Sequence, residues 1–141
     1  ALLVFVLDFF KGFIVVFLLM QLFPAFLWGH VLVGSIVIIG HTLSVFVRFK
    51  GGKGVATGLG VLCAIQPLVS LIVFCLGVLL IKITRYVAPV SILCSLLVPV
   101  LLYYFRTPEP YLYFISVICL FIIIKHTSNI QRLLSGKENK I

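Results

Sequence analysis

Acidic side chains are nearly absent from this sequence, which has only Asp8, Glu109 and Glu138 among its 141 residues. Glycosidases need a pair of carboxylates at the scissile bond, and a Ser-His-Asp triad needs an Asp that can only be Asp8 here. Neither arrangement can be recognised, and His, Cys and acidic residues form no group with metal-ligand spacing. The scarcity argues against ordinary hydrolases, and neither a metal nor another cofactor is expected.

Cysteine pairs of the C-x-x-C type are also absent. The four cysteines, Cys63, Cys75, Cys94 and Cys119, are scattered through apolar runs. Cysteine in such a setting behaves as a small hydrophobic residue. We therefore expect four buried thiols with neither a disulfide nor a metal site.

Charged residues of either sign make up only 10% of the chain, whereas hydrophobic residues make up 63% and the mean hydropathy is +1.35. Soluble domains average about 45–50% apolar and about 25% charged residues. The composition predicts an all-α integral membrane protein with a single membrane domain, residues 1–141. The net charge of +8 fits anionic partners such as phosphates or lipid headgroups, and also the cytoplasmic excess of Lys and Arg in inner-membrane proteins. Nucleic acid is not expected as a partner, because the cations form no long basic face.

The apolar residues fall into five runs, some of them of membrane length. They are 1–23, 29–46, 55–81, 87–105 and 111–124. Within the first run Asp8 and Lys11 are three residues apart, so they share a helix face and are expected to pair. A charged pair inside a span either marks a functional site or is a structural ion pair.

The cations predict the topology. They gather at 48–53, 82–85 and 125–140, whereas the turn 106–110 carries one Arg and one Glu. The first three groups belong on the cytoplasmic side and the turn on the other. Residues 55–81 must then enter the membrane and return, breaking at Gln66-Pro67, with arms of about 17–21 Å against a hydrocarbon core of about 30 Å. With this re-entrant pair of half-length helices, the chain has six hydrophobic helical elements. The alternative, one long tilted span, would put the tail on the opposite side.

The segment RFKGGKGVATG, residues 48–58, interrupts the apolar chain with three cations and four glycines. Glycine lets the backbone approach a ligand, consecutive N–H groups can form an anion nest, and a helix starting near Val55 would point its N-terminus at the same place. The residues expected to bind a phosphate are Lys50, Gly51, Gly52, Lys53, Gly54 and Thr57. The segment is not a Walker A motif, whose first Gly and final hydroxyl would stand at Val47 and Gly54. The alternative is a flexible cytoplasmic loop whose charges only set the topology.

The C-terminal segment KHTSNIQRLLSGKENK, residues 125–140, is the second candidate. His126 and Asn129 share a helix face at the membrane edge, where a neutral imidazole can accept or donate a proton. Arg132 can hold an anionic group through two hydrogen bonds, and Gly136 is the expected C-cap. The alternative is an amphipathic helix that only binds anionic lipid. His41, at the inner end of the run 29–46, is more often structural than catalytic in such a position.

These segments together resemble a known family. GHTLSVFVRFKGGKGVATGLGV, and HTSNIQRLLSGKENK about seventy residues further on, look like the second and third motifs of the bacterial acyl-phosphate:glycerol-3-phosphate acyltransferases (PlsY-type). LLVFVLDFFKG and ITRYVAPVSI are similar to segments that the family carries in the same order. The resemblance therefore covers essentially the whole chain.

The resemblance implies a fold of about seven membrane helices in the bacterial inner (plasma) membrane, with the active site and the C-terminus cytoplasmic. It implies transfer of a fatty acyl group from acyl phosphate to the 1-hydroxyl of glycerol 3-phosphate, giving lysophosphatidic acid and phosphate in phospholipid biosynthesis. It places His126 and Asn129 at the reacting centre, the glycine loop with His41 and Arg132 at a phosphate, and Glu138 with Gly136 in support of the tail. Either His126 or a substrate phosphate takes the hydroxyl proton. A monomer among membrane lipids is expected.

Two departures from the family pattern stand out. Ser44 occupies a position where the family usually has Pro, and no Ser-, Arg- and Gly-Asn-rich first motif precedes the segment around Asp8. We expect an N-terminally truncated member that lacks the first family helix and the first motif. For that reason we expect the 141-residue chain alone to be inactive.

Two other classes of protein remain as alternatives. A small membrane transporter for phosphate-bearing solutes would use the same anion-binding loop and half-length hairpin, although no internal repeat supports it. A non-catalytic membrane subunit would need the basic tail only for contact with lipid.

Overall fold

The computed structural model describes residues 2–43 and 53–141, and this part of the chain is entirely helical. Its helices are α1 (Leu2–Leu22), α2 (Leu27–Thr42), α3 (Val55–Ile65), α4 (Pro67–Thr84), α5 (Ala88–Tyr104), α6 (Glu109–Lys125) and α7 (Thr127–Leu134). The predicted all-α class is confirmed. The predictions for Lys50, Gly51, Gly52 and Ser44 fall outside the described residues.

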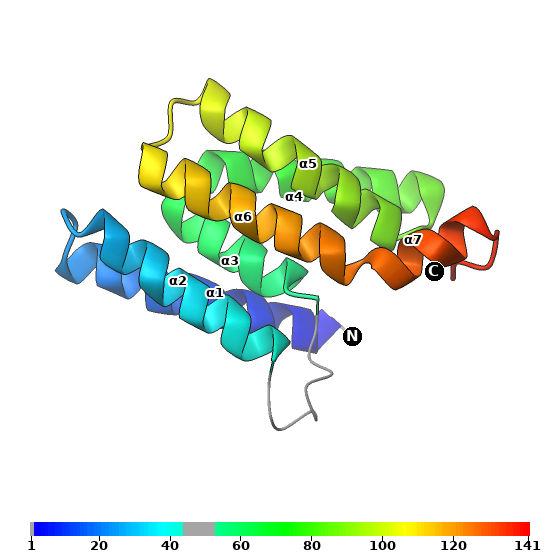
Figure 1. Ribbon diagram of the computed structural model, residues 1–141, viewed down its shortest axis with the longest axis horizontal. Helices are drawn as coiled ribbons and strands as arrows, with labels where there is room; N and C mark the ends of the chain where they lie inside the picture. Colours follow the sequence, from blue (N-terminus) through cyan, green and yellow to red (C-terminus); the bar gives the residue numbers. More distant parts are fainter. Residues whose placement is uncertain (1, 44–52) are drawn as a thin grey trace.

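Successive helices α1 to α6 run back and forth along one direction (Figure 1). One end of the bundle, here named the loop end, holds the start of α1, the end of α2, the start of α3, the α4–α5 turn and α7. The opposite end, named the far end, holds the α1–α2, α3–α4 and α5–α6 turns. A backbone hydrogen bond of 2.9 Å from the Ile141 N–H to the Arg85 carbonyl ties the C-terminus to the α4–α5 turn. The tail and the start of α3 therefore share one end, as the re-entrant topology requires.

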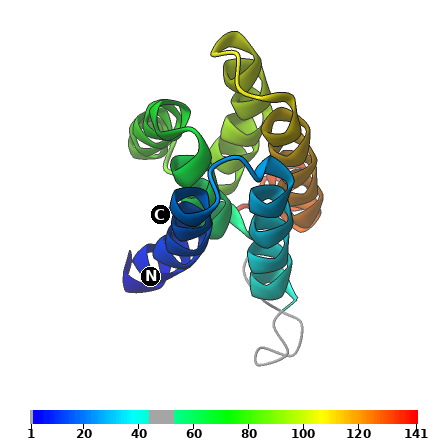
Figure 2. The same cartoon turned by 90° about the vertical axis from the view of Figure 1, so that its left-hand side faces the viewer.

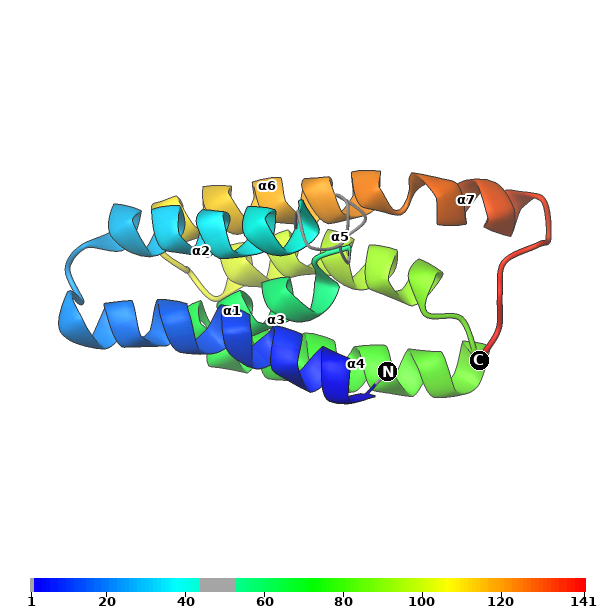
Figure 3. The same cartoon turned by 90° about the horizontal axis from the view of Figure 1, so that it is seen from below.

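Helix α3 lies at the centre of the bundle and contacts α1, α2, α4 and α6. Seen from below, α2 and α6 form one layer and α1 and α4 the other, with α3 and α5 between them (Figure 3), and Figure 2 shows the same packing along the helix axes. The contact with α1 depends on two glycines. A Cβ at Gly60 would lie 2.0 Å from the Phe9 carbonyl oxygen, and one at Gly12 would lie 2.3 Å from that of Thr57. Small residues allow such close helix approach in membranes.

The predicted break at Gln66-Pro67 is present, but its two arms differ in length. Helix α3 has 11 residues, whereas α4 has 18, about 27 Å of helix. Pro67 starts α4 at a position where its missing N–H costs no hydrogen bond. Helix α4 continues past the apolar run because Lys82 in its last turn suits the negative helix C-terminus, and Arg85 ends it at φ 61°. The α4 arm is therefore nearly a full span.

Two helices in the described part, α1 and α4, are long and apolar enough to cross a membrane, and α6 with α7 forms a third candidate bent by 50°. Helix α6 extends beyond the predicted run 111–124, because Glu109 suits its first turn and Lys125 its last. Large hydrophobic side chains are exposed around the bundle, among them Leu2 at 78% and Leu71 at 58%. Lipid contact explains such exposure in an integral membrane protein.

The cysteines only partly follow the prediction. Cys94 and Cys119 are buried and Cys63 is half-buried, but Cys75 is exposed, so the expectation of four buried thiols is wrong for Cys75. Cys75 lies on an outward face of α4, where lipid is as apolar a surrounding as a protein core. All four are free thiols.

His30 is a fully buried residue at the far end of the bundle. Its Nε2 lies 2.9 Å from the Phe23 carbonyl oxygen and its Nδ1 lies 2.6 Å from the Tyr111 hydroxyl. Because a carbonyl only accepts, Nε2 carries the proton and Nδ1 accepts from Tyr111. The pair joins the start of α2 to the start of α6.

Candidate active site

Lys53 and the C-terminal segment meet at the loop end in a chain of hydrogen bonds. The Lys53 ammonium donates to Asn129 Oδ1. Asn129 Nδ2 donates to Glu138 Oε1 at 2.6 Å, and Arg132 Nε donates to Glu138 Oε2 at 3.0 Å. The structure thus brings together predicted residues that stand far apart in the sequence.

The turn after α7 makes this chain possible. Gly136 has φ +70°, its N–H bonds the Leu133 carbonyl at 3.1 Å, and the Lys137 N–H bonds the Arg132 carbonyl at 2.7 Å. These two bonds are those of a Schellman motif, which ends a helix at a glycine. The expected C-cap therefore reverses the chain and brings Glu138 back to Asn129.

His126 lies at the break between α6 and α7 and is only 2% exposed. The sequence predicted that His126 and Asn129 share one helix face, but His126 lies before the first residue of α7. Its carbonyl nevertheless accepts the Asn129 N–H at 2.9 Å. Its Nδ1 lies 2.8 Å from the Ile122 carbonyl oxygen and must carry the proton of that bond. In the neutral imidazole, Nε2 is then an unprotonated acceptor.

Gly54 forms the N-cap of α3 at φ +82°, a conformation that glycine adopts readily. A Cβ there would lie 3.2 Å from Thr42 Cγ2, so α2 packs directly against this turn. The N-terminus of α3 offers unpaired backbone N–H groups and positive dipole charge next to Lys53. This combination suits an anion.

Thr57 and His41 form no hydrogen bond with this group among the described residues. Thr57 is fully buried, packs against Gly12, and its hydroxyl has no hydrogen-bond partner among the described residues. His41 Nδ1 lies 3.4 Å from Asp8 Oδ1, and Lys11 Nζ lies 3.8 Å from the same oxygen. The expected Asp8–Lys11 pair is confirmed, and His41 joins it. The phosphate-binding roles of Thr57 and His41 stay predictions.

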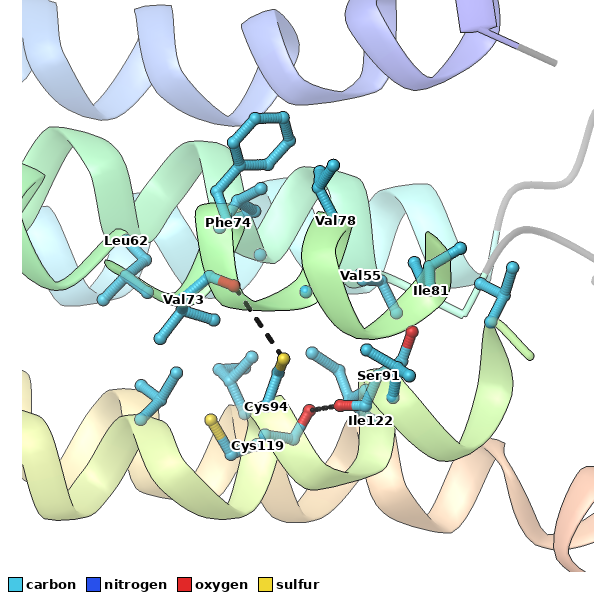
Figure 4. A pocket seen from close by; sticks show the side chains of 18 of the residues that line it. Val55, Leu62, Val73, Phe74, Val78, Ile81, Ser91, Cys94, Cys119 and Ile122 are labelled. Atoms are coloured by element: carbon cyan, nitrogen blue, oxygen red, sulfur yellow. Dashed lines mark hydrogen bonds between the residues drawn. The ribbon is translucent and has the colours of Figure 1, made fainter. Parts of the chain in front are cut away.

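An apolar cavity of about 250 Å³ lies between α3, α4, α5 and α6 (Figure 4). Val55 and Ile122 line it near the loop end, and both are close in sequence to the polar group just described. Ser91 lines the same part, with its hydroxyl pointing into the cavity (Figure 4). Ser91 is part of the family-like segment ITRYVAPVSI, but nothing in that segment assigned a role to it.

Burial and neighbouring charge shift the pKa values in this group. Burial, together with the charge of Arg132, lowers the pKa of Lys53. Burial also lowers the pKa of His126, against the opposing effect of its bond to Ile122. The hydrogen bond from Asn129 holds the pKa of Glu138 below its usual value. At neutral pH the group therefore combines a carboxylate, two cations and a neutral imidazole.

Comparisons with known proteins all match this chain to one family. A sequence model described as glycerol-3-phosphate acyltransferase matches residues 1–136. Glycerol-3-phosphate acyltransferases of Fusobacterium nucleatum and Aquifex aeolicus are each 41% identical, over 97% and 98% of this chain and 70% and 72% of their own length. Crystal structures of PlsY, an integral membrane glycerol 3-phosphate acyltransferase, in its lysophosphatidic acid and glycerol 3-phosphate forms, both superpose with a TM-score of 0.93 at 38% identity. They cover 99% of this chain, which spans 71% and 70% of theirs. The chain therefore belongs to the glycerol-3-phosphate acyltransferase family.

Proposed function

We propose that this protein transfers a fatty acyl group from acyl phosphate to the 1-hydroxyl of glycerol 3-phosphate, giving lysophosphatidic acid and inorganic phosphate. One observation carries the proposal: a polar group with two cations adjoins one end of an apolar cavity, where His126 is hydrogen-bonded to the carbonyl of the lining residue Ile122. Both substrates carry a phosphate, and one also carries a long apolar tail. Family membership and the two PlsY structures support the same reaction.

The proposed roles follow from the geometry of each side chain. Lys53 and the N-terminus of α3 hold a substrate phosphate, and their positive charge stabilises the oxyanion that forms at the acyl carbonyl. The 1-hydroxyl oxygen attacks the acyl carbon, and the bond from that carbon to the phosphate oxygen breaks. The electron pair leaves with the phosphate. His126 Nε2 accepts the hydroxyl proton, because Nδ1 is already engaged with Ile122.

Asn129, Arg132 and Glu138 position these groups. Asn129 fixes the Lys53 ammonium, and Glu138 fixes Asn129. Arg132 neutralises Glu138, so the carboxylate does not repel the substrate phosphates. The Ser91 hydroxyl, in the loop-end part of the cavity lining, donates to the acyl phosphate.

The apolar cavity takes the acyl tail. Its start near Val55 and Ile122 adjoins Lys53 and His126, so a tail inside it leaves the acyl carbonyl at the polar group. Such a cavity, with few polar groups at one end, is typical of sites for amphipathic ligands.

The charge distribution supports an inner-membrane location with the loop end in the cytoplasm. Among the described residues, the far end has one cation, Arg106, close to Glu109. The segments at the loop end carry seven in the same part of the chain, namely Lys53, Lys82, Arg85, Lys125, Arg132, Lys137 and Lys140. Cytoplasmic segments carry the excess of Lys and Arg. The protein acts as a monomer among membrane lipids.

The test is synthesis of lysophosphatidic acid from acyl phosphate and glycerol 3-phosphate in reconstituted vesicles. It compares the chain alone with a version preceded by the helix and first motif that the family resemblance predicts. We expect Lys53→Met to raise the KM for a phosphate substrate by about tenfold or more, since charged hydrogen bonds contribute about 1.5–3 kcal/mol. Lys82→Met, at an exposed lysine of α4, is the matched control. If the extended version with Lys53 intact makes no product, the proposed reaction is wrong.

A further inference from the structure

The apolar cavity extends along the helix axes, so its lining residues can be ordered from the loop end inward. On α5 its lining runs from Val87 near the loop end to Val98, about 16 Å of helix. Ile81, Ser91 and Ile122 lie at the loop-end part, and Leu62 and Val73 at the inner part (Figure 4). The middle level is formed by Gly77, Cys94 and Cys119.

Gly77 differs from the glycines that pack helices together. Gly12 and Gly60 cannot carry a Cβ, because it would lie 2.3 and 2.0 Å from backbone oxygens of a neighbouring helix. A Cβ at Gly77 would lie 3.6 Å from Cys94 Sγ, an ordinary contact distance. Neither helix packing nor backbone conformation therefore requires glycine at this position.

Glycine inside a helix costs about 1 kcal/mol relative to alanine. At Gly77 its structural effect is open space in the middle of the cavity, since only Cys94 Sγ lies within 4 Å of the added atom. A longer side chain at this position would have to extend into the cavity or displace Cys94. The size of residue 77 thus decides whether the two halves of the cavity are continuous.

We propose that Gly77 determines the length of acyl chain that the enzyme accepts, by letting the chain pass from the loop-end half of the cavity into the inner half. The proposal rests on the acyl donor proposed above, because the chain must enter from the polar group at Lys53 and His126. The cavity is shorter than an extended hexadecanoyl chain, so a medium-length tail fits it entirely. The end of a longer tail bends or leaves between helices, where Phe74 and Val78 are 44% and 38% exposed.

The test measures thermal stabilisation of the reconstituted protein by octyl, dodecyl and hexadecyl phosphate, which mimic the donor and cannot react. For Gly77→Leu we expect the affinity for hexadecyl phosphate to fall about tenfold relative to octyl phosphate, because overpacking a filled site costs about 1–3 kcal/mol. Gly77→Ala, whose methyl group fits, should shift the ratio less and in the same direction. Gly40→Leu is the matched control, because a side chain at helical Gly40 meets nothing within 4 Å.

The outcomes separate this proposal from the proposed function. If the parent protein binds the alkyl phosphates, but neither Gly77 variant changes the ratio between long and short chains, the role of Gly77 is wrong and the acyl donor stands. The same holds if affinity falls equally for all lengths. If no alkyl phosphate stabilises the parent protein, the proposed donor fails as well. Should Gly77→Leu not fold, Gly77→Ala alone decides.

Discussion

Asn129 is the side chain on which the polar group depends most directly. Its carbonyl oxygen accepts from Lys53 while its amide nitrogen donates to Glu138, and both contacts are needed at one planar group. Aspartate has the same shape but would face Glu138 with a second carboxylate, and like charges at this distance repel. The amide is therefore a chemical requirement of this position, because it must accept on one side and donate on the other.

The proposed role of His126 as the base leads to an expected pH dependence of the reaction. Burial lowers its pKa below the ordinary value of 6.5, so the neutral imidazole is the major form at that pH and becomes more so as pH rises. We expect the acidic limb of the pH–rate profile to have its midpoint below pH 6.5, with turnover falling as pH drops through the lowered pKa of His126. A pH–rate profile of the active protein checks this, with His126→Gln as the variant that should lose the limb. A limb above pH 7 would contradict the assignment.

The same shift affects stability. Between the lowered pKa of folded His126 and the unfolded value near 6.5, the unfolded state binds more protons. The contribution of this residue to the free energy of unfolding is therefore fully present above the unfolded pKa and is lost as pH falls toward the folded pKa.

At the scale of elements, the short helix α7 is held by its ends. His126 begins it at a 50° bend from α6, and Gly136 ends it in the turn that returns Glu138 to Asn129. Its interior contributes only one buried residue, Asn129. The geometry of the polar group therefore depends on the backbone at His126 and at Gly136, and Gly136 has no proposed contact with substrate.

Gly136 and Gly40 offer a matched pair for testing this dependence. A Cβ at either position meets nothing within 4 Å, but Gly136 has φ +70° whereas Gly40 is inside α2. We expect Gly136→Ala to cost about 1 kcal/mol through backbone strain and to raise the KM for glycerol 3-phosphate by loosening Glu138. Gly40→Ala should leave KM unchanged and stabilise α2 slightly. Thermal unfolding and steady-state kinetics of both variants measure the difference, and equal KM values would show that the turn does not support the site.

For the whole molecule, hydropathy and charge predicted more of the fold than of the site. The break at Gln66-Pro67, and the position of the α3 start and the tail at one end, followed from cation positions and from helix lengths compared with membrane thickness. The unequal lengths of α3 and α4 could not be predicted in this way. The apolar run stops before Lys82, whereas α4 continues through it because a cation in the last turn stabilises the helix. At the site, the motifs predicted Lys53, His126 and Asn129, but not the contact of His41 with Asp8 or the place of Ser91. Those depend on which helix faces meet, and residue spacing within one helix does not determine that.

We expect the far end of the bundle to contribute to the stability of the fold and the loop end to hold the proposed site. Tyr111 allows this expectation to be tested. The Tyr111 hydroxyl is the partner of buried His30 Nδ1 at the far end, away from Lys53 and His126. Tyr111→Phe keeps the ring but leaves Nδ1 without a donor, which should lower the free energy of unfolding by about 1–3 kcal/mol. Tyr113→Phe, on the same helix but 61% exposed, should change it by less than about 0.5 kcal/mol. Because the proposed site lies at the loop end, KM values of both variants should equal those of the parent. A raised KM for Tyr111→Phe with unchanged stability would mean that the His30–Tyr111 pair acts on the site and not on the fold.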